Sequence, residues 1–320
     1  MIRYTSFDQA GLREASGADG LPASSIWLDL LDPTADEIRA LERATGIDLP
    51  SRADMAEIEI SSRLYAEDGA LYMTALVPAR AEIEDMQVEP VTFVLTRSAL
   101  VTIRYHDPRV FEVFMQRAQK NMLDLADGEG ALLELLDTIV DRLADILEGI
   151  GRELDAISGD IFVRGGVNAR SAAAYKTALA RIGRMGDMTS KTRDSLVTLE
   201  RLTSFLGLRL ERGGKRREAL KTVGRDIRSL LDQSGFLSQK VTFLLDGMLG
   251  LINIEQNAII KIFSVAAVIF LPPTLVASIY GMNFEHMPEL TWPLGYPMAI
   301  GLMILSALVP YLFFKRRGWL

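Results

Sequence analysis

Hydrophobic residues gather near the C-terminus of this chain in two long segments. Residues 262–279 and 292–314 contain no charged side chain, and each is long enough to cross a hydrocarbon core of about 30 Å as a helix. We therefore predict two membrane spans, over about 259–280 and 292–314, joined by an outer loop at 281–291. A buried hairpin in a soluble protein would show a similar pattern, but the second segment is followed directly by three basic residues.

The charges that flank the two spans predict their orientation. Lys261 lies at the start of the first span and residues 315–317 are all basic, while the loop between the spans has no Lys or Arg. Basic flanks remain on the cytoplasmic side of a membrane. We therefore expect both termini in the cytoplasm and the loop, with Glu285 and Glu289, on the outer side.

The first 120 residues alternate strand and helix signals. Residues 25–31 are typical of a strand, and residues 34–45 show helical spacing, with Thr34 and Glu37 in the positions of a capping box. Further strand-like runs are separated by turn signals, and they lie at 58–66, 71–78, 90–96 and 100–105. We predict an α+β cytoplasmic domain over 1–120 with an antiparallel element.

Beyond this domain the pattern becomes helical. Apolar residues recur at spacings of three and four within 132–147, and a second helical segment spans 172–210. A third begins near Lys215 and has no strong breaker before the first span, which predicts one stalk helix of about 65 residues, roughly 100 Å long. Residues 121–258 would form the helical cytoplasmic region and residues 259–320 the transmembrane hairpin. So long a helix is expected to pack against its own domain and against other copies.

The composition excludes several kinds of site. The chain has no cysteine and two histidines, so disulfides and zinc sites with several Cys or His ligands are unavailable. A net charge of −7 and a pI near 5.1 disfavour nucleic-acid binding. The glycine pairs lack the context of a phosphate-binding loop and the acidic pairs lack a nearby histidine, so we expect neither a bound nucleotide nor catalysis.

Charge is unevenly distributed along the soluble part. Residues 29–89 contain 15 acidic and 5 basic residues, whereas residues 209–228 contain 8 basic and 3 acidic residues. Two solvated faces would explain this distribution. The alternative is an acidic domain that binds divalent cations beside a basic stalk.

A stripe of small and polar residues runs along the predicted long helix and crosses the membrane boundary. Two rows with a spacing of seven, offset by four, lie side by side on a helix. They are Asp246, Asn253, Ile260, Ala267 and Thr274, and Gly250, Asn257, Ser264, Leu271 and Ser278. Polar residues inside a membrane face a partner or a water-filled cavity, which favours a pore enclosed by several copies. A tight helix–helix seam is the alternative, because small residues also favour close packing. The Pro272–Pro273 pair is expected to bend or loosen this helix.

The loop between the spans resembles the outer loop of CorA-type magnesium/cobalt transporters. The similar residues are Tyr-Gly-Met-Asn-Phe-Glu-His-Met-Pro-Glu-Leu, at 280–290. The similarity extends to Ile-Glu-Gln-Asn at 254–257, to Phe-Leu-Pro-Pro-Thr at 270–274 and to the basic tail at 315–320. The last 80 or so residues match closely, and the N-terminal domain matches in outline.

The resemblance implies a homopentamer with a funnel-shaped cytoplasmic domain in a bacterial inner membrane. The first span would line the pore, and Gly281, Met282 and Asn283 would form the selectivity filter. Mg²⁺ would be the main transported ion, with Co²⁺ and Ni²⁺ as accompanying substrates. The membrane potential would drive uptake and cytoplasmic Mg²⁺ would gate it, with Asp226 and Asp246 as candidate regulatory ligands. Their acidic partner on a neighbouring domain is left open among Glu82, Glu84, Asp85 and Glu89.

The residue types suit passage of a hydrated Mg²⁺ ion. Mg²⁺ prefers oxygen ligands and loses its waters reluctantly, and neutral amide oxygens bind weakly enough for release. Leu271 would be a hydrophobic constriction, and Glu285 and Glu289 would concentrate cations at the outer mouth. The expected pore-lining residues are Asn253, Asn257, Ser264, Leu271, Thr274 and Ser278. The expected cytoplasmic basic collar is Lys261, Lys315, Arg316 and Arg317.

Two other functions remain open at this point. A zinc transporter of the ZntB type would share the fold, although such relatives tend to depart from Met-Asn-Phe-Glu in the loop. A membrane-anchored metal sensor that does not conduct ions would need only apolar spans, so it would not account for the polar stripe.

Overall fold

The computed structural model divides into two compact units, Met1–Leu245 and Asp246–Leu320, and helix α7 (Lys215–Tyr280) belongs to both. Each unit is described by itself. The structure describes residues 2–6, 12–15, 25–57, 59–80, 86–120, 123, 125–163, 172–210, 214–283 and 287–318.

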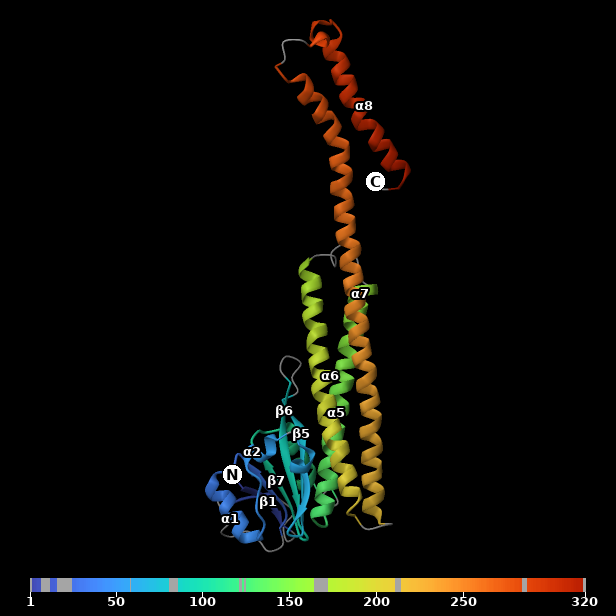
Figure 1. Cartoon of the computed structure of the whole chain (residues 1–320). Coiled ribbons are helices and arrows are strands. Elements are labelled where there is room, and N and C mark those ends of the chain that lie inside the picture. Colours follow the sequence, from blue (N-terminus) through green and yellow to red (C-terminus); the bar gives the residue numbers. More distant parts are fainter. Residues whose placement is uncertain are drawn as a thin grey trace. The chain divides into compact units, whose positions relative to one another are not determined.

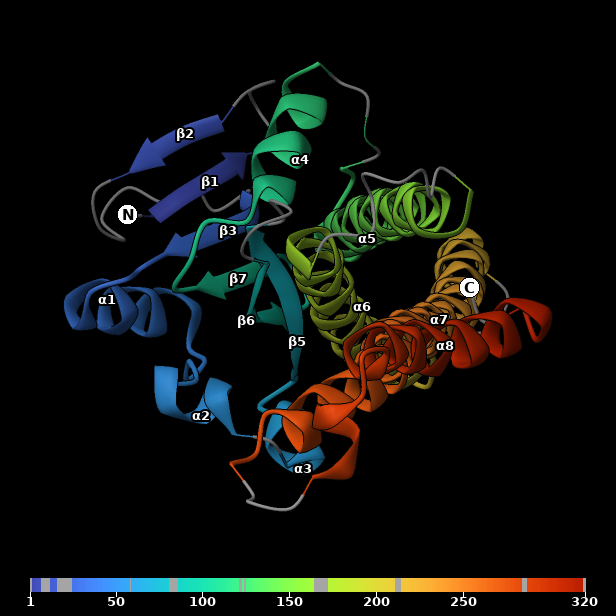
Figure 2. The ribbon, with the colours of Figure 1, turned by 90° about the horizontal axis from the view of Figure 1, so that it is seen from above.

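A seven-stranded sheet forms the first unit's N-terminal part, in the order β2-β1-β3-β7-β6-β5-β4 (Figure 2). All neighbours are antiparallel except β3 and β7, which are parallel. The strands are β1 (Ile2–Ser6), β2 (Leu12–Ala15), β3 (Ser25–Leu31), β4 (Leu64–Glu67), β5 (Ala70–Arg80), β6 (Gln87–Leu95) and β7 (Leu100–Arg104). The predicted antiparallel element is thus present, but β1 and β2 were not predicted.

Local signals correctly predicted the first strand–helix pair. After β3, helix α1 (Ala35–Thr45) starts at a capping box in which the Thr34 N–H donates to Glu37 Oε2 at 2.9 Å. The same hydrogen bond is the main reason that the pKa of Glu37 is lowered. The helix ends at Gly46, whose φ of 71° favours glycine.

The strand predicted over 58–66 is wrong in its first half. Helices α2 (Arg52–Ala56) and α3 (Ile60–Arg63) precede β4, which begins only at Leu64. The backbone turns because Ser62 N–H donates to Glu59 O, and the Arg63 guanidinium donates to Glu57 O. Alternating apolar residues resembled a strand, but these hydrogen bonds favour a turn.

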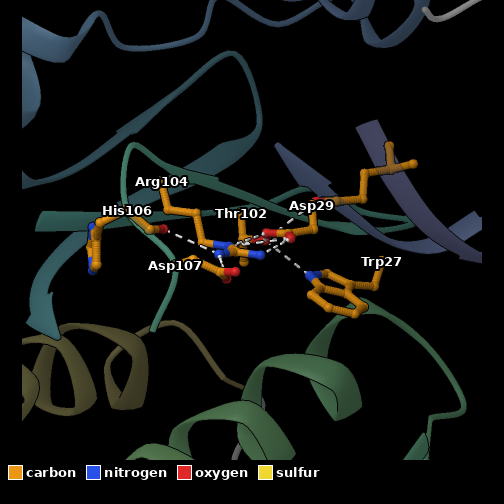
Figure 3. Close-up of polar contacts among 7 residues, drawn as sticks. Trp27, Asp29, Thr102, Arg104, His106 and Asp107 are labelled. Carbon is orange, nitrogen blue, oxygen red and sulfur yellow. Dashed lines mark hydrogen bonds and ion pairs between the residues drawn. The ribbon is translucent and has the colours of Figure 1, made fainter. Parts of the chain in front are cut away.

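Two charged side chains lie in the centre of the sheet (Figure 3). Arg104 on β7 donates to both carboxylate oxygens of Asp29 on β3, with 2.7 Å between Nη2 and Oδ2. Thr102 donates to Asp29 at 2.6 Å, and Trp27 Nε1 donates to Thr102 at 3.1 Å. Burial alone would lower the pKa of Arg104, but Asp29 and Asp107 raise it. The network thereby joins the only parallel strand pair among the described strands.

Two long helices cover one face of the sheet, and the first part of α7 lies on their other side (Figures 1 and 2). Helix α4 (Arg109–Gln119) leads into α5 (Gly128–Ser158), which ends in a π-helical turn at Gly159–Val163 and is followed by α6 (Ala172–Gly207). Glycines permit close packing: a Cβ at Gly186 would lie 3.4 Å from Val241 Cγ1, and one at Gly207 would lie 3.6 Å from Leu220 Cδ2. Three long helices, α5, α6 and α7, thus follow the sheet along the chain.

Helix α6 also hydrogen-bonds the backbone of β5 directly. Leu76 lies beyond Met73, where the pairing of β5 with β4 ends. Its N–H donates to Thr198 Oγ1 at 2.9 Å, and its carbonyl accepts from Ser195 Oγ at 2.5 Å. Hydroxyls of α6 therefore replace a missing strand partner.

The second unit consists of the rest of α7, a 3₁₀ turn at Pro288–Thr291 and helix α8 (Gly295–Arg316). Both helices are long and apolar enough to cross a membrane. Only 6% of the apolar 18-residue segment of each helix is buried within a single chain. Lipid or other copies of the chain must cover these apolar faces. The second helix starts three residues later than the predicted span.

Candidate functional site

The polar stripe on α7 is exposed along its whole length in the second unit. All six expected pore-lining residues are exposed in the single chain, and they are Asn253, Asn257, Ser264, Leu271, Thr274 and Ser278. Val265 is buried, and Ile269 and Val276 are half-buried, all on the opposite side of the helix. The covered side is therefore apolar, whereas the polar stripe and large apolar residues such as Phe263 and Phe270 are left free for lipid, solvent, an ion or another copy.

The helix continues through two prolines beside this stripe. Pro272 and Pro273 have no N–H to donate to the preceding turn, yet α7 extends to Tyr280. Thr274 Oγ1 donates to Phe270 O at 2.7 Å, which occupies the hydroxyl within its own helix. Leu271, directly before the two prolines, has 68% of its surface exposed, so this part of the stripe has a large apolar side chain.

The predicted filter residues come directly after the end of α7. Gly281 N–H donates to Ala277 O at 2.9 Å, and Met282 N–H donates to Ile279 O at 3.3 Å. Gly281, Met282 and Asn283 are all exposed. The Asn283 side chain is thus presented at the end of the same helix that carries the stripe.

The outer loop is only partly described. Glu285 lies outside the described residues, as does His286. Glu289 is half-buried in the 3₁₀ turn, and a Cβ at Gly295 would lie 2.2 Å from the Glu289 carbonyl oxygen. Only glycine permits this approach, which fixes the turn against the start of α8. The sequence prediction missed this contact, although Gly295 after Trp292 and Pro293 was a signal for it.

The expected basic collar gathers at the other end of the helical hairpin. Lys261 Nζ donates to the carbonyl of Gly318 at 3.4 Å, which places Lys261 beside the C-terminal turn. Lys315, Arg316 and Arg317 are exposed at the end of α8. Residues from both predicted spans therefore contribute to one basic end of the second unit.

The two expected regulatory carboxylates are exposed on α7. In the first unit, Asp226 is close enough to Asp137 to affect it: burial first, and then the carboxylates of Asp141 and Asp226, raise the pKa of Asp137. Asp246 is exposed in the second unit. Sequence reasoning missed Asp137 and Asp141, although their i, i+4 spacing on one helix was visible.

The described part of a single chain does not bring together a complete set of acidic metal ligands. Among the described residues, no three His, Asp or Glu side chains come together in a way that could hold a metal ion. Four acidic residues were candidate partners of Asp226 and Asp246 in the regulatory site. Glu89 is exposed on β6, and Glu82, Glu84 and Asp85 lie outside the described residues.

Comparison with known proteins decides the family. Residues 22–316 match the family model described as CorA-like Mg²⁺ transporter protein. The chain belongs to this family. The Magnesium transport protein CorA of Mannheimia succiniciproducens is 37% identical over 318 residues, which cover 99% of this chain and 97% of that protein.

Solved structures show the same CorA fold. The CorA magnesium transporter of Methanocaldococcus jannaschii has a TM-score of 0.80 and 20% identity, covering 100% of this chain and 98% of that one. The cytoplasmic domain of ZntB from Vibrio parahaemolyticus has a TM-score of 0.58 and 12% identity, covering 79% of this chain and 98% of that one. At these identities the likeness concerns the fold alone. The predicted family and fold class are confirmed: an α+β domain, a long helix and two C-terminal apolar helices.

Proposed function

We propose that five copies of the chain form a Mg²⁺ channel in a bacterial inner membrane, with the polar stripe of α7 around a central pore. The observation that carries this proposal is the stripe itself, which is exposed from Asn253 to Ser278 on the largely apolar second-unit part of α7. Polar side chains in a membrane need a partner or water, and a ring of identical helices would supply both. The naming of 37%-identical relatives as magnesium transport proteins supports Mg²⁺ as the ion.

Asn283 would select the ion at the outer mouth. Five amide oxygens could hold a Mg²⁺ ion through its first shell of water, without the cost of dehydrating it. Glu285 and Glu289 would raise the local cation concentration there. Co²⁺ and Ni²⁺ would pass by the same route, because they are divalent ions that also carry a hydration shell.

The membrane potential would drive uptake. Two charges that move inward at −100 mV release about 4.6 kcal/mol, at roughly 2.3 kcal/mol per charge. No nucleotide is needed for this step. Both termini would lie in the cytoplasm, with the basic end of the second unit, including Lys261 and Arg316, on the same side.

Cytoplasmic Mg²⁺ would regulate the channel at Asp226 and Asp246. Since a single described chain brings no three acidic groups together for a metal, a regulatory site would combine carboxylates of two copies. Bound Mg²⁺ would then hold neighbouring copies together and keep the pore closed.

Ion flux into proteoliposomes tests the proposal. We expect Mg²⁺ entry to rise when an inside-negative potential is imposed and to exceed Zn²⁺ entry. Zinc entry alone would assign the protein to zinc transport. Absence of flux from a protein shown to be pentameric would favour a sensor instead.

A further inference from the structure

One face of α7 in the first unit carries four basic residues, of which Arg217 is half-buried and the other three are exposed; the acidic Glu218 and Asp226 are exposed on the same turns. Arg217, Lys221, Arg225 and Arg228 follow one another at spacings of four, four and three, and we call them the basic stripe. They lie on the side opposite the buried residues of the same turns, such as Val223 and Ile227. Lys221 pairs with Glu218 at 2.6 Å, but no described carboxylate lies within ion-pair distance of the three arginines.

An acidic surface lies at the β4 edge of the sheet. It consists of Asp48, Asp54, Glu67 and Asp68, and we call it the acidic patch; all four are exposed. The patch surrounds the stacked rings of Tyr65 and Tyr72, which are 4.5 Å apart, and the Tyr72 hydroxyl donates to Asp48 O. Burial is the main cause of the raised pKa of both tyrosines, and carboxylates of the patch add to it. No described Lys or Arg forms an ion pair with them.

The two surfaces cannot meet within one chain. The sheet, with α1 and α2, lies on one side of α5 and α6, and the first part of α7 lies on the other (Figures 1 and 2). Surfaces of opposite charge on opposite sides of a unit allow a head-to-tail contact between copies, and such contacts generate a ring when the rotation from one copy to the next closes.

We propose that the basic stripe of each copy docks on the acidic patch of the next copy. The inference rests on the proposed ring assembly and specifies a contact that sets the register of the copies. Isolated surface ion pairs contribute little, but several opposed charges steer association and disfavour wrong registers. The chain itself carries the complementary acidic surface, so no foreign polyanion is required.

Charge reversal on the full-length protein in detergent tests the contact. We expect Arg225→Glu with Arg228→Glu to weaken the ring at least about tenfold on dilution, as measured by native mass spectrometry. Asp48→Lys with Glu67→Lys should do the same, and all four changes combined should restore the ring. Asp54 and Asp68 are left unchanged, because Asp54 caps α2 and Asp68 has a φ of 48°. The matched control, Arg152→Glu with Lys176→Glu, changes exposed charges outside both surfaces and should have no effect.

Cross-linking gives a second measurement that does not depend on stability. The chain has no cysteine, so Glu67→Cys with Arg225→Cys introduces the only thiols. A short thiol-reactive cross-linker should produce a ladder above the dimer, whereas Glu67→Cys with Lys176→Cys should not. An intact ring that is insensitive to charge reversal and yields no ladder would overturn the contact and leave the assembly standing. A monomeric wild-type protein would overturn the assembly as well.

Discussion

Arg104 and Asp29 form an ion pair in which neither side chain has any exposed surface, on strands that are adjacent in the sheet but 75 residues apart in sequence. A buried charge is costly unless it is paired and hydrogen-bonded. Here Thr102, Asp107 and the carbonyl of His106 complete the hydrogen bonds of the pair (Figure 3). The pair therefore makes the β3–β7 register specific, because a shifted register would leave both charges unpaired.

Loss of this pair should destabilise the N-terminal domain strongly. Asp29→Asn keeps the shape of the side chain but leaves the Arg104 charge buried without a counter-ion, and we expect a loss of about 3–5 kcal/mol. Asp36→Asn is the control, because Asp36 is 92% exposed in its pair with Arg39 and should contribute under about 1 kcal/mol. Thermal unfolding in detergent would measure both, and equal midpoints for the two variants would contradict the role of the pair.

The hydroxyls that α6 provides to β5 should also be measurable. Thr198→Val removes the acceptor for Leu76 N–H, and we expect a loss of about 1–3 kcal/mol because that donor stays partly buried. Thr177→Val on the same helix removes only an exposed hydroxyl bonded to Ala173 O, so it should be nearly neutral. Similar unfolding midpoints for the two variants would show that water satisfies Leu76 instead.

Two glycines of α5 should respond in opposite directions to the same substitution. Gly128→Ala would place a Cβ 2.5 Å from the backbone carbon of Ala99, so the loop before β7 must shift and stability must fall. Gly149→Ala meets nothing within 4 Å and should stabilise the helix by about 0.5–1 kcal/mol. Unfolding midpoints that move in the same direction would show that the close approach at Gly128 is relieved at no cost.

His106 should make stability depend on pH. Burial first, and then the charge of Arg104, lower its pKa to about 4. The unfolded chain binds this proton near pH 6.5, so the stabilising contribution is complete above that pH and is lost as pH falls toward about 4.

We therefore expect His106→Phe to reduce the loss of stability between pH 7 and pH 5. The control is His286→Gln, since His286 is the only other histidine. Parallel pH profiles for wild type and His106→Phe would show that other groups cause the dependence.

Asn283 provides the most direct test of the proposed filter. Asn283→Ala removes the amide oxygens and should abolish Mg²⁺ flux in proteoliposomes while the oligomer stays intact. Thr291→Ala in the same loop only removes a hydroxyl bonded to Pro288 O and should keep its flux. Normal Mg²⁺ entry through the Asn283→Ala protein would rule out the selectivity role.

If the outer mouth recognises Mg²⁺ together with its hydration shell, a stable mimic of the hydrated ion should inhibit transport. Hexaamminecobalt(III) resembles hydrated Mg²⁺ in size and octahedral shape but does not exchange its ligands, so it should block entry from the outer side. Transport that continues at high inhibitor concentration would count against recognition of the hydrated ion.

Local signals predicted a large part of the molecule. The capping box at Thr34, the strand at 25–31 and the unbroken helix from Lys215 to Tyr280 depend on spacings within a few turns of the chain, and all three are present. The exposed stripe on α7 was predicted for the same reason, because helical periodicity alone determines which residues share a face. Its role in conduction stays a prediction.

Only the tertiary structure decided how distant segments combine. The sequence predicted neither the parallel pairing of β3 with β7, nor the burial of Asp29 and Arg104, nor the approach of Gly295 to Glu289. Such contacts depend on which surfaces meet after the chain has folded, and no short-range periodicity encodes that. The amino-acid order thus determined the long helices, the two apolar spans and the family, whereas packing decided the strand order and which charges are buried.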